Sequence, residues 1–193
     1  MTIETEEGNR ILHQKAEPVT EFGAELNKFC RNMLRVMRSE RGMGLAAPQV
    51  GVSLRIIVIA TSQNNEKILI NPEIIEASES KKWIEGCLSV PGRRYRRERF
   101  DKVKVRYFTP FGGEKVEEFV NNTSTPWAHC VQHEMDHLEG RVLSDLPETA
   151  VSDEEEDEMD KRSKARVAGF MPLLLGFAVQ GQMAMEGAGI LKK

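Results

Sequence analysis

The residue types most suited to chemistry lie together in one pentad, His133-Glu134-Met135-Asp136-His137. Residues four apart on a helix share a face, so two histidines at this spacing can hold one metal ion between them. Glu134 falls beside them, where a carboxylate can take up and return a proton. The pentad therefore predicts a metal site with an adjacent general base, but it does not specify the reaction.

A catalytic metal site of this type needs a third protein ligand and an open position. Cys87 lies between glycine and proline turns in the segment 85–92 rather than in a periodic apolar stripe, which suggests that its thiol faces a site. No histidine follows His137, so a downstream glutamate is a second source of the ligand, although Glu139 is too close in sequence. On the residues alone the choice stays open among Cys87, Glu148 and Glu154.

Segment 42–51, Gly-Met-Gly-Leu-Ala-Ala-Pro-Gln-Val-Gly, combines small residues with one amide side chain, that of Gln49. Such a composition allows the backbone to approach a ligand closely, although glycine-rich loops often only turn the chain. Cys30 differs from Cys87 because it lies inside an apolar helical stripe, and we expect it to be a core residue.

Two helices are expected to frame these segments. Apolar residues at helical spacing predict an amphipathic helix over residues 20–41, with Gly42 as its C-cap. A second helix is expected from about 124 to 140, because Ser124 and Thr125 offer capping hydroxyls and Pro126 suits the first turn. This second helix carries the pentad.

The middle of the chain is expected to be β-rich. Apolar runs at 55–60 and 68–70 predict strands, the second ending at the Asn71-Pro72 breaker. Alternating apolar and charged residues predict a hairpin of strands 102–108 and 115–120 around a glycine-containing turn.

The overall composition fits one compact enzyme domain. The chain has 193 residues, 40% apolar residues and a net charge of −3, so direct nucleic-acid binding is not expected. Three scattered cysteines argue against a disulfide framework, and the polar, acidic N-terminus lacks a secretory pattern, so we expect a cytoplasmic protein. We expect a catalytic domain over 1–147, followed over 148–193 by an acidic linker and an apolar tail too short to span a membrane.

Taken together, segments 42–51, 85–91 and 132–140 resemble the three motifs of the peptide deformylases in their order and spacing. The resemblance extends from about Ile11 to Leu146. It implies an α+β fold with antiparallel β-sheets packed around a central metal-binding helix (HExxH), preceded by an N-terminal amphipathic helix. The implied activity is metal-dependent hydrolysis of the N-formyl group from formyl-methionine at the start of nascent polypeptides, which releases formate.

The resemblance also implies roles for the residues that could hold a metal. Cys87, His133 and His137 would be the ligands, the natural metal would be Fe2+, and Zn2+, Ni2+ or Co2+ could substitute. Glu134 would be the general base that activates the metal-bound water and later the acid that protonates the departing amine.

Further residues would contact the substrate. The Leu88 backbone N–H and the Gln49 side-chain amide would stabilise charge on the formyl oxygen. The resemblance implies substrate-binding positions in three segments, namely Met43, Gly44, Arg94, His129 and Cys130. The implied partners are N-formylmethionyl nascent peptides, met at the ribosome, with no membrane contact.

Two other functions are compatible with the pentad. A zinc endopeptidase would use the two histidines and a downstream glutamate, but it leaves Cys87 and Gln49 unexplained. A structural zinc module would add Cys87 and Cys130 to the histidines, but it has no need of Glu134.

Overall fold

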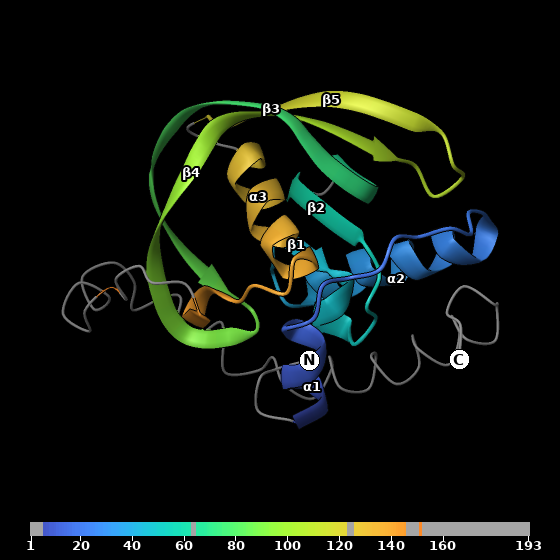
Figure 1. Cartoon of the computed structure of the whole chain (residues 1–193), viewed down its shortest axis with the longest axis horizontal. Coiled ribbons are helices and arrows are strands. Elements are labelled where there is room, and N and C mark those ends of the chain that lie inside the picture. Colours follow the sequence, from blue (N-terminus) through green and yellow to red (C-terminus); the bar gives the residue numbers. More distant parts are fainter. Residues whose placement is uncertain (1–5, 63–64, 123–125, 146–150, 152–193) are drawn as a thin grey trace.

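The structure, a computed structural model, describes residues 6–62, 65–122, 126–145 and 151. Figure 1 shows a curved antiparallel sheet with one helix inside its concave side and a second helix on the other side. The sheet has the strand order β1-β2-β3-β4-β5. Its elements are α1 (Glu6–Leu12), α2 (Ala24–Ser39), β1 (Gly44–Ala46), η1 (Ala47–Val50), β2 (Ile56–Ser62), β3 (Asn65–Cys87), β4 (Val90–Phe108), β5 (Glu114–Val120), α3 (Trp127–Leu138) and η2 (Leu143–Asp145).

The two longest strands, β3 and β4, form one long hairpin that ends at the pair Cys87 and Val90. The prediction that the strand stops at Asn71-Pro72 was wrong, because β3 continues to Cys87. The chain passes this point through a shift of register between Ile70 and Glu73, with Asn71 at φ 49°. Asparagine tolerates this left-handed conformation, and a bulge accommodates a proline that cannot donate a hydrogen bond. The predicted strands overlap the observed ones in order: 55–60 with β2, 68–70 with β3, 102–108 with β4 and 115–120 with β5.

Helix α2 occupies most of the predicted span 20–41 and buries Cys30 with the rest of its apolar stripe. The prediction of Gly42 as its C-cap was wrong, because the C-cap is Glu40 and the left-handed residue is Arg41, at φ 56°. The Arg41 N–H donates to the Arg38 carbonyl at 3.0 Å, and the Gly42 N–H donates to the Met37 carbonyl at 2.9 Å. These two bonds complete a Schellman motif with arginine at the position usually held by glycine.

Helix α3 begins at Trp127 with Pro126 as its N-cap, so the proline lies just before the first turn rather than inside it. The expected capping residues Ser124 and Thr125 lie outside the described residues. The Gln132 side chain ties the helix to β4, accepting from the Phe100 N–H at 3.0 Å and donating to the Phe100 carbonyl at 2.8 Å.

The two largest of three core clusters are separated by β2, and the third surrounds Cys87. Ile56 and Val58 face a cluster formed with α2, while Ile57 and Ile59 face a cluster formed with α3. A strand covered on both faces needs apolar residues at every position, which explains the uninterrupted apolar run in the sequence. The cluster formed with α3 fixes this helix, and with it the histidine pentad, against the sheet.

The chain beyond the compact part is described only at Val151, whose N–H donates to the Arg94 carbonyl at 3.0 Å. The expected boundary between 147 and 148, the acidic segment and the apolar tail lie outside the described residues. Within the described ranges no helix is long and apolar enough to cross a membrane.

Candidate metal and catalytic site

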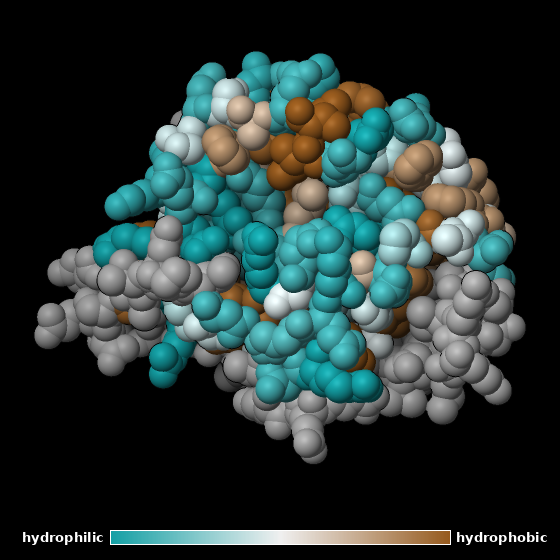
Figure 2. Space-filling view, in the orientation of Figure 1, coloured by the Kyte–Doolittle hydropathy of each residue, from teal (hydrophilic) through white to brown (hydrophobic). Residues whose placement is uncertain are grey.

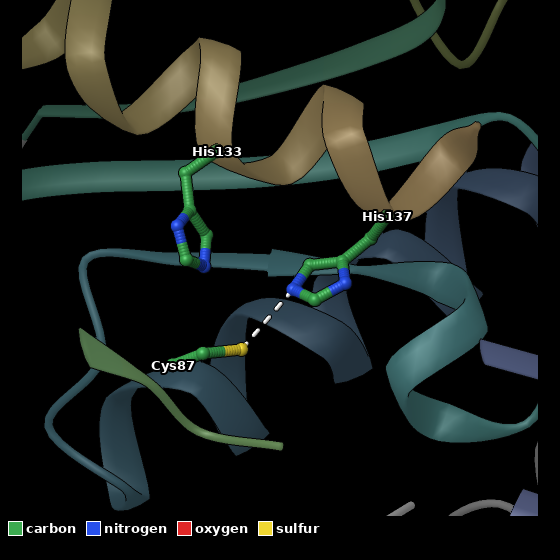
Figure 3. Close-up of side chains that lie close together, drawn as sticks. All are labelled: Cys87, His133 and His137. Atoms are coloured by element: carbon green, nitrogen blue, oxygen red, sulfur yellow. Dashed lines mark hydrogen bonds between the residues drawn. The ribbon is translucent and has the colours of Figure 1, made fainter. Parts of the chain in front are cut away.

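Three candidate ligands converge from two elements that are distant in sequence. Cys87 is the last residue of β3, whereas His133 and His137 lie one turn apart on α3. Each offers a ligand atom, and these atoms all lie within 4.8 Å of one another. Figure 3 shows the three side chains pointing toward one another, with the Cys87 sulfur 3.2 Å from His137 Nε2.

The surroundings of Cys87 favour its thiolate form. Burial raises the pKa of this thiol, but the neighbouring His137 and His133 overcome that effect and hold it well below its ordinary value. The Ser89 N–H donates to the sulfur at 3.4 Å, and Gln49 Nε2 lies 3.8 Å from it. The site therefore offers a thiolate, the ionisation state that a metal ligand requires.

His133 is held by a buried carboxylate, because its Nδ1 lies 2.5 Å from Glu85 Oε2. The other ring nitrogen is thereby left to serve as the ligand atom. Arg99 binds both oxygens of Glu85, at 2.9 and 3.1 Å, and reaches Asp136 Oδ2 at 2.6 Å. Burial raises the pKa of Glu85, but hydrogen bonds from His129 and His133 and the charges of His133 and Arg99 outweigh it and hold this pKa well below its usual range.

Neither Glu85 nor Arg99 is predicted to have a role from the sequence. Glu85 lay within the second motif, and Arg99 was one of five arginines between residues 93 and 99. Of these five arginines, Arg99 is buried, whereas the other four are half-buried or exposed. Strand alternation places Arg93 and Arg97 on the same face as Arg99, so no local pattern in the sequence singles out Arg99.

His129 lies beside the same carboxylate, with its Nε2 3.3 Å from Glu85 Oε2. Its ring contacts the Trp83 ring at a centroid distance of 5.2 Å, and its backbone N–H donates to Asn121 Oδ1 at 3.0 Å. The predicted pocket residue is therefore next to the candidate metal ligands and turned toward β3.

Glu134 is buried against Gly44 of β1. Burial raises its pKa to about 7, even though His133 and His137 act in the other direction. A Cβ atom added to Gly44 would overlap Glu134 Oε1 and lie 2.8 Å from the Cys130 sulfur, so only glycine fits there. Burial also raises the pKa of Cys130 well above its ordinary value, which keeps this thiol protonated.

The remaining predicted residues surround this centre. Gln49 is buried, accepts from the Ala46 N–H at 2.8 Å and donates to Ser89 Oγ at 3.2 Å. Leu88 lies in the turn between β3 and β4, and a Cβ added to Gly42 would lie 3.0 Å from its side chain. Met43 is 50% exposed next to Gly44. Arg94 lies opposite Gly86 across the hairpin, whereas Cys87 pairs with Val90.

The donor set fits a divalent metal ion. A thiolate and two imidazoles suit several first-row metals. Two buried polar atoms, His137 Nδ1 and Glu134 Oε2, have no hydrogen-bond partner among the described residues. The unpaired Glu134 oxygen fits a site in which a reacting water or substrate group completes the hydrogen bonds.

The two alternative readings find less support. Glu139 pairs with Arg55 at 2.7 Å and Lys15 at 3.0 Å, away from the histidines, while Glu148 and Glu154 lie outside the described residues. The group of ligand atoms that could hold a metal includes Cys87 but not Cys130, which argues against a closed four-ligand zinc module.

A three-ligand group beside a buried carboxyl, carried by a helix and the end of a neighbouring strand, is typical of metal-dependent hydrolases. The family model of polypeptide deformylase matches residues 4–151. A peptide deformylase of Natranaerobius thermophilus is 40% identical over 146 residues, which cover 75% of this chain and 91% of the relative. The chain therefore belongs to the peptide deformylase family, whose members remove the formyl group from N-terminal formyl-methionine.

Solved structures agree with this assignment. The peptide deformylase of Thermotoga maritima matches with a TM-score of 0.66 and 39% identity over 72% of this chain and 91% of its own. A class I type b peptide deformylase of Acinetobacter baumannii, bound to Met-Ala-Ser, matches with a TM-score of 0.64 and 38% identity over 70% of this chain and 91% of its own. Both support the antiparallel fold of the family.

Proposed function

We propose that this enzyme removes the formyl group from N-formylmethionyl nascent polypeptides with a metal ion held by Cys87, His133 and His137. The observation that carries the proposal is the convergence of these three ligand atoms within 4.8 Å, beside the buried Glu134. The products are formate and a peptide with a free N-terminal amine.

When bound, the metal polarises the formyl group and makes water acidic enough to attack near neutral pH. Glu134 Oε2 takes the proton of the attacking water and passes it to the departing amine nitrogen. In the metal-free chain burial raises the pKa of this carboxyl to about 7, and a nearby metal ion would lower it toward the ionised form that accepts a proton. Glu85 and Arg99 serve this step indirectly, by fixing the His133 ring.

Charge that develops on the formyl oxygen is stabilised by the Leu88 backbone N–H and the Gln49 side-chain amide. The placement of Gln49 supports this role, because its Oε1 is occupied by the Ala46 N–H and its Nε2 is aimed at Cys87. Each donor of this kind typically contributes about 3 to 4 kcal/mol.

The substrate peptide is bound as an added strand along β1, near Met43 and Gly44. Among the residues that the structure describes, β1 pairs with β2 alone, so its other edge can form main-chain hydrogen bonds that do not depend on side-chain identity. His129 and Cys130 contact the first side chain, and Arg94 lies near the peptide backbone. The Acinetobacter relative bound to Met-Ala-Ser supports a methionine-led peptide as ligand.

The physiological metal is proposed to be Fe2+, with Zn2+, Ni2+ or Co2+ as substitutes, because the thiolate and imidazole donors accept all of them. The reaction takes place in the cytoplasm, on chains emerging from the ribosome. We assign it to residues 1–147 and regard 148–193 as an appendage outside the catalytic domain.

The test is an anaerobic assay of the metal-reconstituted protein on formyl-Met-Ala-Ser, with an internal peptide bond as the competing substrate. Release of formate from the first substrate without cleavage of the second is the expected result. Cleavage of the internal bond would favour the zinc endopeptidase, and inactivity on both with metal bound would favour a structural zinc module.

A further inference from the structure

Buried polar side chains are few in this protein, and Ser89 is one whose role has not been explained. Figure 2 shows a surface that is hydrophilic over much of the face in view, which is where most polar side chains lie. Within the described ranges, six buried polar or charged residues already have a role, namely Gln49, Glu85, Arg99, Gln132, Glu134 and His137. Ser89 is buried with them at 0% exposure and has no role among those described above.

Ser89 contacts two groups of the site at once. It is the second residue of the turn that joins β3 to β4, directly after Leu88. Its backbone N–H donates to Cys87 Sγ at 3.4 Å, and its hydroxyl oxygen accepts from Gln49 Nε2 at 3.2 Å. A hydroxyl is costly to bury without a hydrogen bond, so the contact with Gln49 compensates for the burial of Ser89.

The side-chain amide of Gln49 is held at both ends. Its Oε1 accepts from the Ala46 N–H at 2.8 Å, which determines which end of the amide is the oxygen. Its Nε2 donates to Ser89 and lies 3.8 Å from the Cys87 sulfur. The last torsion of a glutamine side chain has a broad range of angles, so contacts at both ends are needed to aim the donor. A donor that is aimed in advance stabilises developing charge without reorganising.

We propose that Ser89 is a positioning residue, whose hydroxyl group aims the Gln49 amide at the formyl oxygen. The inference rests on the proposed deformylation and deepens it, because it names the group that orients one of the two donors to the developing charge. Ser89 itself neither touches the substrate nor moves a proton. Loss of its hydroxyl leaves Gln49 in the site but lets the amide turn, so the cost falls on the charged transition state more than on peptide binding.

A double-mutant cycle on the metal-reconstituted full-length protein tests this role. Ser89→Ala should lower kcat for formyl-Met-Ala-Ser about five- to tenfold with KM little changed, which corresponds to the loss of one neutral hydrogen bond. In the Gln49→Met chain, which has no amide to aim, the same change should alter kcat by less than about twofold. An equal loss in both backgrounds would overturn the proposal, because Ser89 would then act without Gln49.

Two controls separate this role from a loss of folding or of metal. Ser80→Ala removes a hydroxyl from β3 of the same hairpin, one that donates to Glu98 Oε1 at 2.7 Å on the exposed surface, and it should leave kcat unchanged. Metal content should be the same in Ser89→Ala and the parent, because alanine retains the backbone N–H that donates to Cys87. A fall in kcat that merely follows a fall in metal content would contradict the positioning role.

A second measurement needs no turnover. In NMR spectra of the isotope-labelled metal-free protein, the Gln49 side-chain amide signals are identified by their loss in Gln49→Met. Ser89→Ala should shift these signals and speed their exchange with water about five- to tenfold, because one hydrogen bond is lost. The Gln132 side-chain signals should stay unchanged, since that amide donates to the Phe100 and Ala128 carbonyls.

The outcomes distinguish this inference from the proposed function. If the metal-loaded parent released no formate, the proposed deformylation itself would be wrong. If the parent is active but the Gln49 signals do not respond to Ser89→Ala, the role of Ser89 is overturned and the deformylation stands. Equal shifts in the Gln49 and Gln132 signals would also overturn that role, because they would show a general loosening of the fold.

Discussion

Two glutamates beside the candidate metal site are equally buried, each 4% exposed, yet their pKa values shift in opposite directions. On the β3–β4 side, Glu85 receives hydrogen bonds from two histidines and two from Arg99. On the β1 side, the Glu134 Oε2 atom has no partner among the described residues. Burial alone therefore does not determine the charge of a carboxyl, because the donors around it decide whether desolvation is overcome.

The opposite pKa shifts of Glu85 and Glu134 suit the two carboxyls to different roles. A carboxylate that stays ionised can hold a histidine ring, while a carboxyl that titrates near neutral pH can exchange protons with a substrate. Pairs of acidic groups whose environments separate their pKa values often divide catalytic roles in this way. The contrast between Glu85 and Glu134 can be tested by removing each group and its donors.

Glu134→Gln should produce the largest effect. The amide preserves the shape of the side chain but cannot take a proton, so kcat should fall about 10²- to 10⁴-fold. Metal content, measured by elemental analysis, should remain that of the parent. Near-normal turnover would show that another group transfers the proton and would remove the functional contrast between the two glutamates.

Arg99→Met should destabilise the fold. Arg99 and Glu85 form a buried ion pair, with side chains 6% and 3% exposed, and breaking such a pair leaves an uncompensated charge. The free energy of unfolding, from urea titration of the metal-free protein, should fall by about 3 to 5 kcal/mol. Arg106→Met, which breaks the exposed pair with Glu73, is the matched control and should change stability far less, because water already solvates both charges. Similar losses in both variants would contradict a special role for the buried donors.

Glu85→Gln should weaken the metal site through His133. The amide can still contact the ring but is a much weaker acceptor for its Nδ1–H, and loss of such a partner typically lowers metal affinity about 10- to 100-fold. Competition with a chelator measures the change. Unaltered affinity, with the parent's visible spectrum of the Co2+ form, would mean that Glu85 does not hold the ligand.

The smallest effect concerns the pH dependence of stability in the metal-free protein. The pKa of Glu134 is about 7 in the folded chain against an ordinary 4.5, so its contribution is fully present below about pH 4.5 and is lost as pH rises through 7. The pKa of Glu85 is shifted downward from the same ordinary value, so its contribution is present above about pH 4.5 and is lost at lower pH.

Unfolding free energies measured from pH 3 to 8 separate these two contributions. The stability of the parent relative to Glu134→Gln should decrease between about pH 4.5 and 7. Relative to Glu85→Gln, the parent should lose stability only below about pH 4.5. Parallel curves for both variants would show that the two carboxyls titrate alike.

The sequence predicted the site best where its residues are close neighbours. His133, Glu134 and His137 lie within one helical turn or so, and helix geometry alone places them on one face. The strands were found for the same reason, since alternation and apolar runs are local patterns. The extent of β3 was misjudged at Asn71, because the bulge there is stabilised by side-chain bonds to Val19, 52 residues away.

What the sequence by itself determined is the inventory: the histidine pair, the glutamate between them, a cysteine in a turn and a glycine segment that allows close approach. The tertiary structure decided which groups meet, because the cross-strand register and the packing of α3 bring Glu85 and Arg99 to His133. It also decided the charge of each glutamate. Desolvation and hydrogen bonding depend on atoms within a few ångströms in space, and most of those atoms come from residues far apart in the chain.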